Sequence, residues 1–561
     1  MRPRGMSNAY VQITFWEQCP ALIHPSGVEE PKVPGTIDMK VTDDSRTAYG
    51  LSLTPTPSAD PNDPLNWTQR KKYSILFLVS AYSFLANGAL FGPSVYVNFL
   101  AQRFGKTPSE TSQLVNNPNL LFGLAGSLVF VPMYQKIGRR PTMLISILIF
   151  CIGLLGCALS KSYDVLMGFR MVHGFGSSVC EALPAQAVAD VFFFHERGKA
   201  LGWYTFALVT GTLSATAASY MLSSGLSYNL FFWIEFAIGC VLFLATLAFF
   251  EETMYLEERQ PPSPSSQQPI DADSTKDEPQ ATSECMESRL EESIAVPRRK
   301  TYLEQCKIFG KTDPSTPVFM MMIRSFTYLI VPQVFWVCST YGMVIGLAGL
   351  AFTSTFPNIV AAPPYSWPIV GYPLVNSENT GLVAISAFIG YLVAAGPFST
   401  VPDRVSAWLA RKNNNIHEAE YRLWCLVVVF FVSPAALILY GYSAEKQLHW
   451  FGLVFAVGLF QFGAFFYLTY TLAYAMDSYE SKMPEMLIAM NIGKQSISFA
   501  FGYKVIDWVQ ANGYINVFAG IFCGVLTINN LFVFIFLIFG KWFRRWLSTT
   551  ALSKMHRESL G

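Results

Sequence analysis

The sequence predicts an all-α membrane protein with twelve transmembrane helices in two pseudo-symmetric six-helix bundles, and three observations lead to this fold class. Of the 561 residues, 52% are hydrophobic and only 14% are charged, whereas about 25% are charged in an average soluble protein. Twelve stretches reach the roughly 20 mostly apolar residues that a bilayer span requires. A long polar segment divides these stretches into six and six.

The twelve predicted spans follow one another with short loops, apart from the central segment. They lie at residues 73–97, 113–134, 142–160, 165–190, 200–222, 228–250, 325–350, 380–402, 424–442, 450–474, 485–508 and 515–540. Lys and Arg are concentrated in the loops on the side of the N-terminus, and such loops stay in the cytosol. Both termini are therefore expected to be cytosolic, with the protein in the plasma membrane.

The polar segments define the domain boundaries. Residues 1–69 are polar and rich in Pro, and residues 251–317 begin with acidic residues and the run PPSPSSQQP. Such compositions cannot bury a hydrophobic core. We expect a disordered cytosolic tail over 1–69, a six-helix bundle over 70–250, a cytosolic linker over 251–317, a second bundle over 318–541 and a cytosolic tail over 542–561.

Composition and motifs argue against several classes of protein. The formal net charge of +1 lacks the clustered basic excess of a nucleic-acid-binding protein. The ten Cys are scattered, mostly through apolar runs, and are interpreted as small buried hydrophobic residues. The sequence contains no P-loop and no H-E-x-x-H motif. It therefore predicts no enzymatic activity, no cofactor, no metal site and no nucleic-acid partner.

The fourth predicted span carries the strongest polar signal within the membrane. It contains Arg170, His173 and, near its middle, Glu181. A charge near the bilayer centre costs about 2.5–3.5 kcal/mol on insertion scales, so such a residue is paired or faces a cavity. Glu181 is interpreted as a proton or cationic-substrate site. The alternative is a structural ion pair with Arg170 or with a neighbouring helix.

Other polar and aromatic residues are weaker candidates. Lys494, deep in the eleventh span, is expected to meet an acid across a central cavity or to line the substrate path, with Asn491 close by. Glu235 lies in the sixth span, where an outer interfacial position is the alternative. Aromatic side chains can stack on a substrate, although aromatic residues on membrane helices also serve packing. The aromatic candidates are Tyr341, Tyr467 and Tyr470.

Several motifs resemble those of the major facilitator superfamily. The loop "VPMYQKIGRRP" (Val131 to Pro141) is similar to the family pattern G-x-x-x-D-[RK]-x-G-[RK]-[RK], and departs from it at Val131 and Gln135. "LMGFRMVHGFG" (Leu166 to Gly176) resembles R-x-x-Q-G-x-G, with His173 in place of the Gln. Further segments resemble a fungal branch: DPLNW (63–67), FFFHERGKALGWY (192–204), EETMY (251–255), APPYSW (362–367), DRVSAWLARKNNNIHEAEYRLW (403–424) and YAMDSY (474–479).

The resemblance implies a latch at the cytoplasmic gate. In the family the basic residues of this loop pair with an acid at the inner end of the fourth span, for which Asp190 is the matching residue. A related acid and base recur after the eighth span, as an internal repeat would produce. The implied gate residues are Lys136, Gly138, Arg139, Arg140, Asp190, Asp403 and Arg404. The alternative is that the basic cluster only fixes the topology.

The resemblance implies a secondary active transporter that moves a small organic molecule by alternating access, with Glu181 and Arg170 in proton coupling. Its expected partners are the substrate, protons and the lipid bilayer, and it is expected to be a monomer. Export of a secondary metabolite or toxin is favoured, although the antiporter motif of the fifth span is weak. The alternative is proton-coupled uptake of an organic cation such as a polyamine. A remote alternative is a nutrient sensor that transports nothing.

Overall fold

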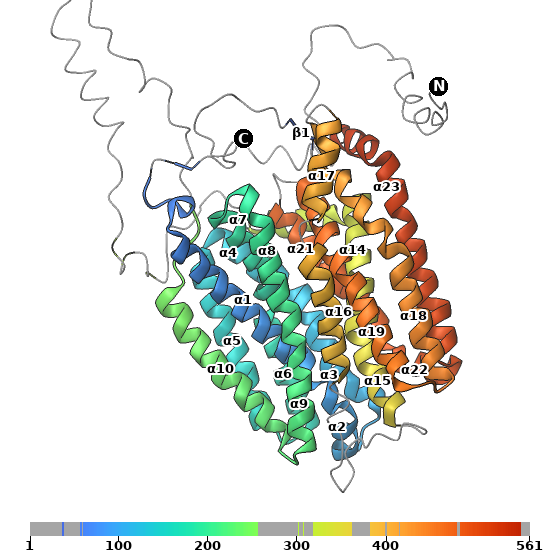
Figure 1. Ribbon diagram of the computed structural model, residues 1–561. Helices are drawn as coiled ribbons and strands as arrows, with labels where there is room; N and C mark the ends of the chain where they lie inside the picture. Colours follow the sequence, from blue (N-terminus) through green and yellow to red (C-terminus); the bar gives the residue numbers. More distant parts are fainter. Residues whose placement is uncertain are drawn as a thin grey trace, which may run out of the picture.

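The computed structural model describes residues 36–38, 57–58, 60–255, 301, 304, 307, 318–361, 382–398, 401–413, 416–478 and 483–550. Its helices form two bundles that lie side by side, the first built from α1 to α10 and the second from α13 to α23 (Figure 1). The buried apolar side chains form two clusters, one within the second bundle and one centred on the first bundle that also includes Met321, Leu350, Ile488 and Ile492 of the second. The described helices confirm the predicted fold class.

The first bundle contains six rods, several of which consist of helical segments joined end to end. In chain order they are α1 (Gln69–Phe91) with η3 (Gly92–Tyr96) and α2 (Val97–Phe104); α3 (Pro108–Leu121) with η4 (Phe122–Gly126) and α4 (Ser127–Lys136); α5 (Arg139–Leu159); α6 (Tyr163–Ser177) with α7 (Val179–Val191); α8 (Phe194–Thr210) with η5 (Gly211–Leu213) and α9 (Ser214–Ser223); and α10 (Tyr228–Phe249).

The second bundle follows the same plan, with additional short helices at its ends. In chain order it comprises α13 (Val318–Tyr328); α14 (Pro332–Val344) with η7 (Ile345–Phe352) and α15 (Thr353–Ala361); α16 (Leu382–Phe398); α17 (Val401–Lys412); η9 (Ala419–Val427) with α18 (Val429–Glu445); α19 (Trp450–Phe466) with η10 (Tyr467–Thr471) and α20 (Leu472–Ser478); α21 (Met483–Tyr503); α22 (Val505–Asn512); and η12 (Ile515–Phe522) with α23 (Cys523–Thr549).

Length and hydropathy identify the clearest membrane spans. Among the described residues, seven continuous helices are long and apolar enough to cross a bilayer, or eight if the bent pair η9 and α18 is one span. The rods outside this set include the one formed by α6 and α7, which contains Arg170 and Glu181, and α21, which contains Lys494. Polar residues thus enter the bundle on the helices that are weakest as membrane spans.

Large apolar side chains also cover the outside of the molecule. Phe77 is 71% exposed, Val241 is 68% exposed and Phe319 is 75% exposed. A soluble protein rarely exposes apolar surface on this scale, whereas a surrounding bilayer solvates it. The outer side chains therefore agree with a protein that spans a membrane.

The two bundles make direct contacts at the end that carries α2, α15 and α22, here called the opposite end. The Asn98 side chain on α2 donates a hydrogen bond to the Asn358 side chain on α15 at 2.9 Å. The Asn116 side chain on α3 donates to the Gly502 carbonyl on α21 at 3.1 Å. The other end, here called the basic end, carries Arg139, Arg140 and α17.

Several predicted boundaries differ from the structure by a few residues, and the clearest differences lie at three places. The segment 1–69 is not wholly disordered, because Thr36–Asp38 forms a strand, β1, antiparallel to β2 (Ile416–Glu418), and Pro64–Asn66 forms a 3-10 turn, η2. The seventh rod begins at Pro332 instead of residue 325, since α13 ends at Tyr328. The last helix continues to Thr549, beyond the predicted boundary at 541. Most of the predicted linker and tails lies outside the described residues.

A close contact between α6 and α3 provides a test of the packing. A methyl group added at Gly174 would lie 2.9 Å from both the carbonyl carbon and the Cα of Pro118, whereas one added at Gly168 of the same helix would meet nothing within 4 Å. Overpacking costs about 1–3 kcal/mol. Gly174→Ala should therefore lower the unfolding temperature of the purified protein, and Gly168→Ala should leave it unchanged or slightly higher. Equal effects of the two substitutions would contradict this packing.

Candidate functional site

A cavity lies between the two bundles, with about 140 Å³ of space for the centres of water-sized molecules. The first bundle contributes walls from α1, α3, η4, α7, α8 and η5, and the second from α14, η7, α19, η10, α20 and α21. Its lining residues are Asn87, Leu90, Phe91, Asn119, Phe122, Glu181, Ala182, Ala185, Tyr204, Thr205, Leu208, Val209, Thr212, Tyr341, Val344, Ile345, Gln461, Leu468, Leu472, Leu487, Met490, Asn491, Lys494 and Gln495.

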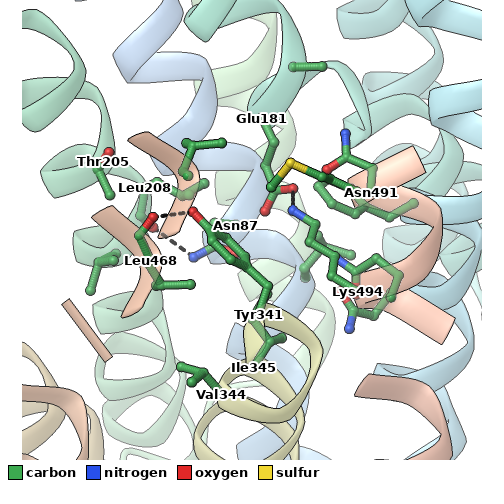
Figure 2. Close-up of a pocket in the computed structure, with 18 of the residues that line it drawn as sticks. Asn87, Glu181, Thr205, Leu208, Tyr341, Val344, Ile345, Leu468, Asn491 and Lys494 are labelled. Atoms are coloured by element: carbon green, nitrogen blue, oxygen red, sulfur yellow. Dashed lines mark hydrogen bonds and ion pairs between the residues drawn. The ribbon is translucent and has the colours of Figure 1, made fainter. Parts of the chain in front are cut away.

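An ion pair between Glu181 and Lys494 crosses this cavity. The Lys494 ammonium donates a hydrogen bond to the Glu181 carboxylate, which joins α7 of the first bundle to α21 of the second (Figure 2). The side chains of Glu181 and Lys494 are 15% and 5% exposed, respectively. Removing two charges from water is costly, and their mutual attraction offsets that cost only while both are present. The pair is therefore a charged bridge between the bundles.

Aromatic and carboxamide groups position the walls around this pair. The Lys494 Nζ lies 5.6 Å from the centre of the Tyr341 ring, within reach of a cation–π interaction. The Tyr341 hydroxyl donates to the Leu468 carbonyl, and the Asn87 amide donates to the Leu208 carbonyl at 2.7 Å (Figure 2). Tyr341 and Asn491 thus lie on the cavity wall.

The other two tyrosines proposed to line the cavity lie elsewhere. Tyr467 and Tyr470 are absent from the cavity lining and are buried in the core of the second bundle. The Tyr467 hydroxyl accepts a hydrogen bond from the Asn530 side chain at 2.7 Å, and the Tyr470 hydroxyl donates to the Phe398 carbonyl at 2.8 Å. Their hydroxyls form hydrogen bonds between neighbouring helices. Tyr467 and Tyr470 therefore serve helix packing, which was the alternative to lining the cavity.

Arg170 does not pair with Glu181; it binds backbone carbonyls. Its guanidinium donates to the carbonyls of Ala89 at 2.6 Å, Leu90 at 2.8 Å and Leu114 at 3.0 Å, and the residue is fully buried. The residues four positions after Ala89 and Leu114 are Pro93 and Pro118, which have no N–H to offer a helical hydrogen bond. Arg170 therefore satisfies carbonyls that two prolines leave unpaired, and ties α6 to α1 and α3.

His173 and Glu235 are buried away from the cavity. The His173 ring packs against Phe150, with centroids 5.1 Å apart, and neither ring nitrogen has a hydrogen-bond partner among the described residues. Glu235 on α10 is 7% exposed, and its Oε2 likewise has no hydrogen-bond partner in the described part of the chain. Neither side chain contributes to the cavity wall.

At the basic end, Arg139 pairs with Asp190 as the resemblance implies. The Arg139 Nε donates to the Asp190 carboxylate at 3.0 Å, and the same carboxylate accepts a bond from the Gln186 amide at 3.0 Å. The Arg139 guanidinium also donates to the Tyr134 carbonyl at 3.1 Å. Lys136, by contrast, is exposed. The Arg139–Asp190 pair lies within the first bundle, where it joins α5 to α7.

Glu252, just after α10, completes this network and was not anticipated from the sequence. Its carboxylate accepts the backbone N–H groups of Arg139 at 2.9 Å and Arg140 at 3.2 Å, which open α5. Anionic groups stabilise helix N-termini in this way. Gly138 has φ +119°, and a methyl group there would lie 3.0 Å from the Glu252 Cδ, so only Gly suits the position. The Arg140 guanidinium donates to the carbonyls of Leu247 and Phe250.

The second bundle uses different residues at its basic end. The Asp403 side chain lies outside the described part of the structure, so its role remains a prediction, and Arg404 on α17 is exposed. The Glu420 carboxylate lies 2.5 Å from Nη2 of Arg544, and both side chains are buried. The Glu418 carboxylate lies 2.5 Å from Nζ of Lys541. These two pairs connect helix α23 with the segment that follows α17.

Among the described residues, no group of three His, Cys, Asp or Glu side chains is placed to hold a metal ion.

Comparisons with known proteins agree with this architecture. The family model described as Major Facilitator Superfamily matches residues 76–503. The chain is 23% identical over 556 residues to Protein HOL1 of Saccharomyces cerevisiae, covering 89% of this chain and 92% of that one. It is 26% identical over 426 residues to the MFS-type transporter atr4 of Stereocaulon alpinum, covering 75% and 69%.

A solved structure shares the fold. The proton:xylose symporter XylE, bound to 6-bromo-6-deoxy-D-glucose, superimposes with a TM-score of 0.55. The sequences are 13% identical, and the match covers 84% of this chain and 97% of XylE. At this level of identity the likeness concerns the arrangement of helices alone.

Substitution of Lys494 tests the buried ion pair. Lys494→Met leaves the Glu181 carboxylate without its partner, and breaking a buried pair in this way costs up to about 3–5 kcal/mol. The unfolding temperature of the purified protein at neutral pH should fall. The double variant Glu181→Gln with Lys494→Met removes both charges and should recover most of the loss. A single variant as stable as the parent protein would show that the pair carries no stability.

Glu252 offers a second test at the basic end. Glu252→Ala should lower stability by about 1–3 kcal/mol, since it removes the acceptor for two backbone N–H groups. Glu252→Gln keeps an acceptor oxygen and should lie between Ala and the parent. The exposed Lys136 supplies the control, because Lys136→Gln should have little effect. If all three variants have the same unfolding temperature, Glu252 does not stabilise the start of α5.

Proposed function

The chain belongs to the major facilitator superfamily and is a transporter, not an enzyme, and from this premise we propose that it couples proton movement to the transport of a small organic molecule. The observation that carries the proposal is the ion pair between Glu181 and Lys494. It joins the two bundles inside the cavity, where a change in charge alters the affinity of one bundle for the other.

In the proposed mechanism, the Glu181 carboxylate binds Lys494 in one state and a proton in the other. While Glu181 is ionised, Lys494 holds α7 against α21. When a proton neutralises the carboxylate, the attraction is lost and the bundles are released to rock about the cavity. Substrate enters on one side and leaves on the other, as alternating access requires. Deprotonation restores the pair and completes the cycle.

The surrounding networks suit rigid-body motion of this kind. Arg139, Asp190 and Glu252 bind α5, α7 and the end of α10 to one another within the first bundle. Arg544 and Glu420 do the same within the second bundle. We place the basic end in the cytosol, as its excess of Lys and Arg predicts, and the protein in the plasma membrane as a monomer. The bundles then move as units, and the contacts between them change.

We propose export as the direction of transport, following the fungal branch that the motifs resemble. Uptake of an organic cation is the second candidate, and the position of Glu181 on the cavity wall, with its side chain 15% exposed, favours it. An ammonium group that entered the cavity would compete with Lys494 for that carboxylate. The two directions differ in the sense of the pH gradient that drives accumulation. Proteoliposomes containing a pH-sensitive dye, tested against a panel of small organic molecules with either gradient, distinguish them.

Glu181→Gln is the decisive variant for coupling. It keeps the size of the side chain and its ability to form hydrogen bonds but removes the proton exchange, so the initial rate of gradient-driven accumulation in proteoliposomes should fall at least about tenfold, a barrier change of about 1.4 kcal/mol. Exchange of substrate across the membrane without a gradient should continue. Lys161→Gln, at an exposed side chain outside the cavity lining, is the control and should transport normally. Full gradient-driven accumulation by Glu181→Gln would refute the proton role.

A further inference from the structure

We infer that the substrate carries no net charge and presents a hydrogen-bond donor and an acceptor side by side, as a carboxamide does. This inference rests on the proposed function, because it takes the cavity as the substrate site. It concerns which molecules the cavity selects, and three properties of the lining residues support it.

The first property is charge balance. Glu181 and Lys494 are the only acidic and basic side chains among the residues that line the cavity in the described structure, and they neutralise each other. A buried charge without a partner is costly. A charged substrate would bring such a charge with it, or would have to displace one member of the existing pair. While Glu181 is ionised, a neutral substrate leaves the pair intact, so this inference counts against the organic-cation candidate.

The second property is a pair of unsatisfied polar atoms on two side chains that line the cavity from opposite bundles. The Nδ2 of Asn119 on α3 is a donor and the Oε1 of Gln495 on α21 is an acceptor. Neither has a hydrogen-bond partner among the described residues, although both side chains line the cavity and both residues are only 2% exposed. Buried polar atoms in folded proteins are rarely left unpaired, and these two differ from most other unpaired atoms in belonging to residues of the cavity wall, where a ligand could supply their partners.

The third property is the close approach of the helices that carry these atoms. A methyl group added at Gly123, one helical turn after Asn119, would lie 2.9 Å from the Asn491 carbonyl and would overlap the Gln495 side chain. Asn119 and Gln495 therefore come from opposite bundles at a point where the bundles meet. A carboxamide that accepts from Asn119 and donates to Gln495 would bridge them. The nearby walls are apolar, with Leu90, Phe122 and Ile345, and suit a hydrocarbon or aromatic body.

A matched series of ligands tests this inference. Phenylacetamide, phenethylamine and phenylacetate share a ring and a short chain but are neutral, cationic and anionic. Their binding to the purified full-length protein is measured from the shift of its thermal unfolding with ligand concentration, followed by tryptophan fluorescence. Phenylacetamide should stabilise the protein, and the other two should do so at least about tenfold less effectively. Equal or tighter binding of the amine or the acid, or no shift with the amide, overturns the inference.

Two variants locate the binding. Asn119→Leu and Gln495→Leu should each weaken the effect of phenylacetamide roughly threefold to tenfold, as expected for one neutral hydrogen bond. Asn116→Leu removes a buried carboxamide that lies on α3 outside the cavity lining, and should keep the preference for the amide. Without ligand the two cavity variants should unfold no earlier than the parent, since each removes an unpaired atom. Unweakened binding in both would also overturn the inference.

The ligand series separates this inference from the proposed function. Binding is measured in detergent without a pH gradient, so a protein that prefers the amide but shows no proton-driven flux contradicts only the proposed function. Conversely, proton-driven flux of phenethylamine with no binding of phenylacetamide contradicts only the choice of substrate class.

Discussion

The ion pair between Glu181 and Lys494 is the interaction on which the rest of the molecule depends. It places opposite charges on two helices from different bundles, in a region where neither charge has bulk water around it. Such a pair adds little net stability compared with an apolar contact, yet it becomes costly once either partner is missing. In the proposed mechanism, this pair makes the association of the bundles conditional on the protonation of Glu181 and on what occupies the cavity. The carboxamides of Asn119 and Gln495 lie beside the same boundary.

A second constraint is that backbone groups in a membrane must find partners within the protein. Prolines interrupt the helices of the first bundle, and at Pro93 and Pro118 the carbonyls one turn earlier lose their usual donor. Arg170 supplies donors to both. A residue that the family resemblance connects with proton coupling thus has a structural task that is visible in the fold. At the basic end, Glu252 accepts hydrogen bonds from the backbone N–H groups at the start of α5, as Arg170 donates hydrogen bonds to unpaired carbonyls.

The fold was largely predictable from the sequence because most membrane spans are recognisable from the length and hydropathy of a continuous stretch of residues. The site was less predictable because its contacts join residues far apart in the chain. Glu181 and Lys494 were both recognisable as buried charges, but their separation by 313 positions hides the pairing. Aromatic residues gave an ambiguous signal, since Tyr341 lies on the cavity wall while Tyr467 and Tyr470 pack between helices. Glu252 resembled other acidic residues at the head of a polar linker, and only the folded loop shows its role.

The hydrogen bonds at the opposite end, Asn98 to Asn358 and Asn116 to Gly502, have a consequence for how the protein responds to its surroundings. Both join uncharged groups, so dissolved ions do not screen them as they screen exposed charges. Separation of the bundles there moves no formal charge on these residues through the membrane field. The contribution of these two hydrogen bonds to holding the bundles together at that end should therefore change little with ionic strength.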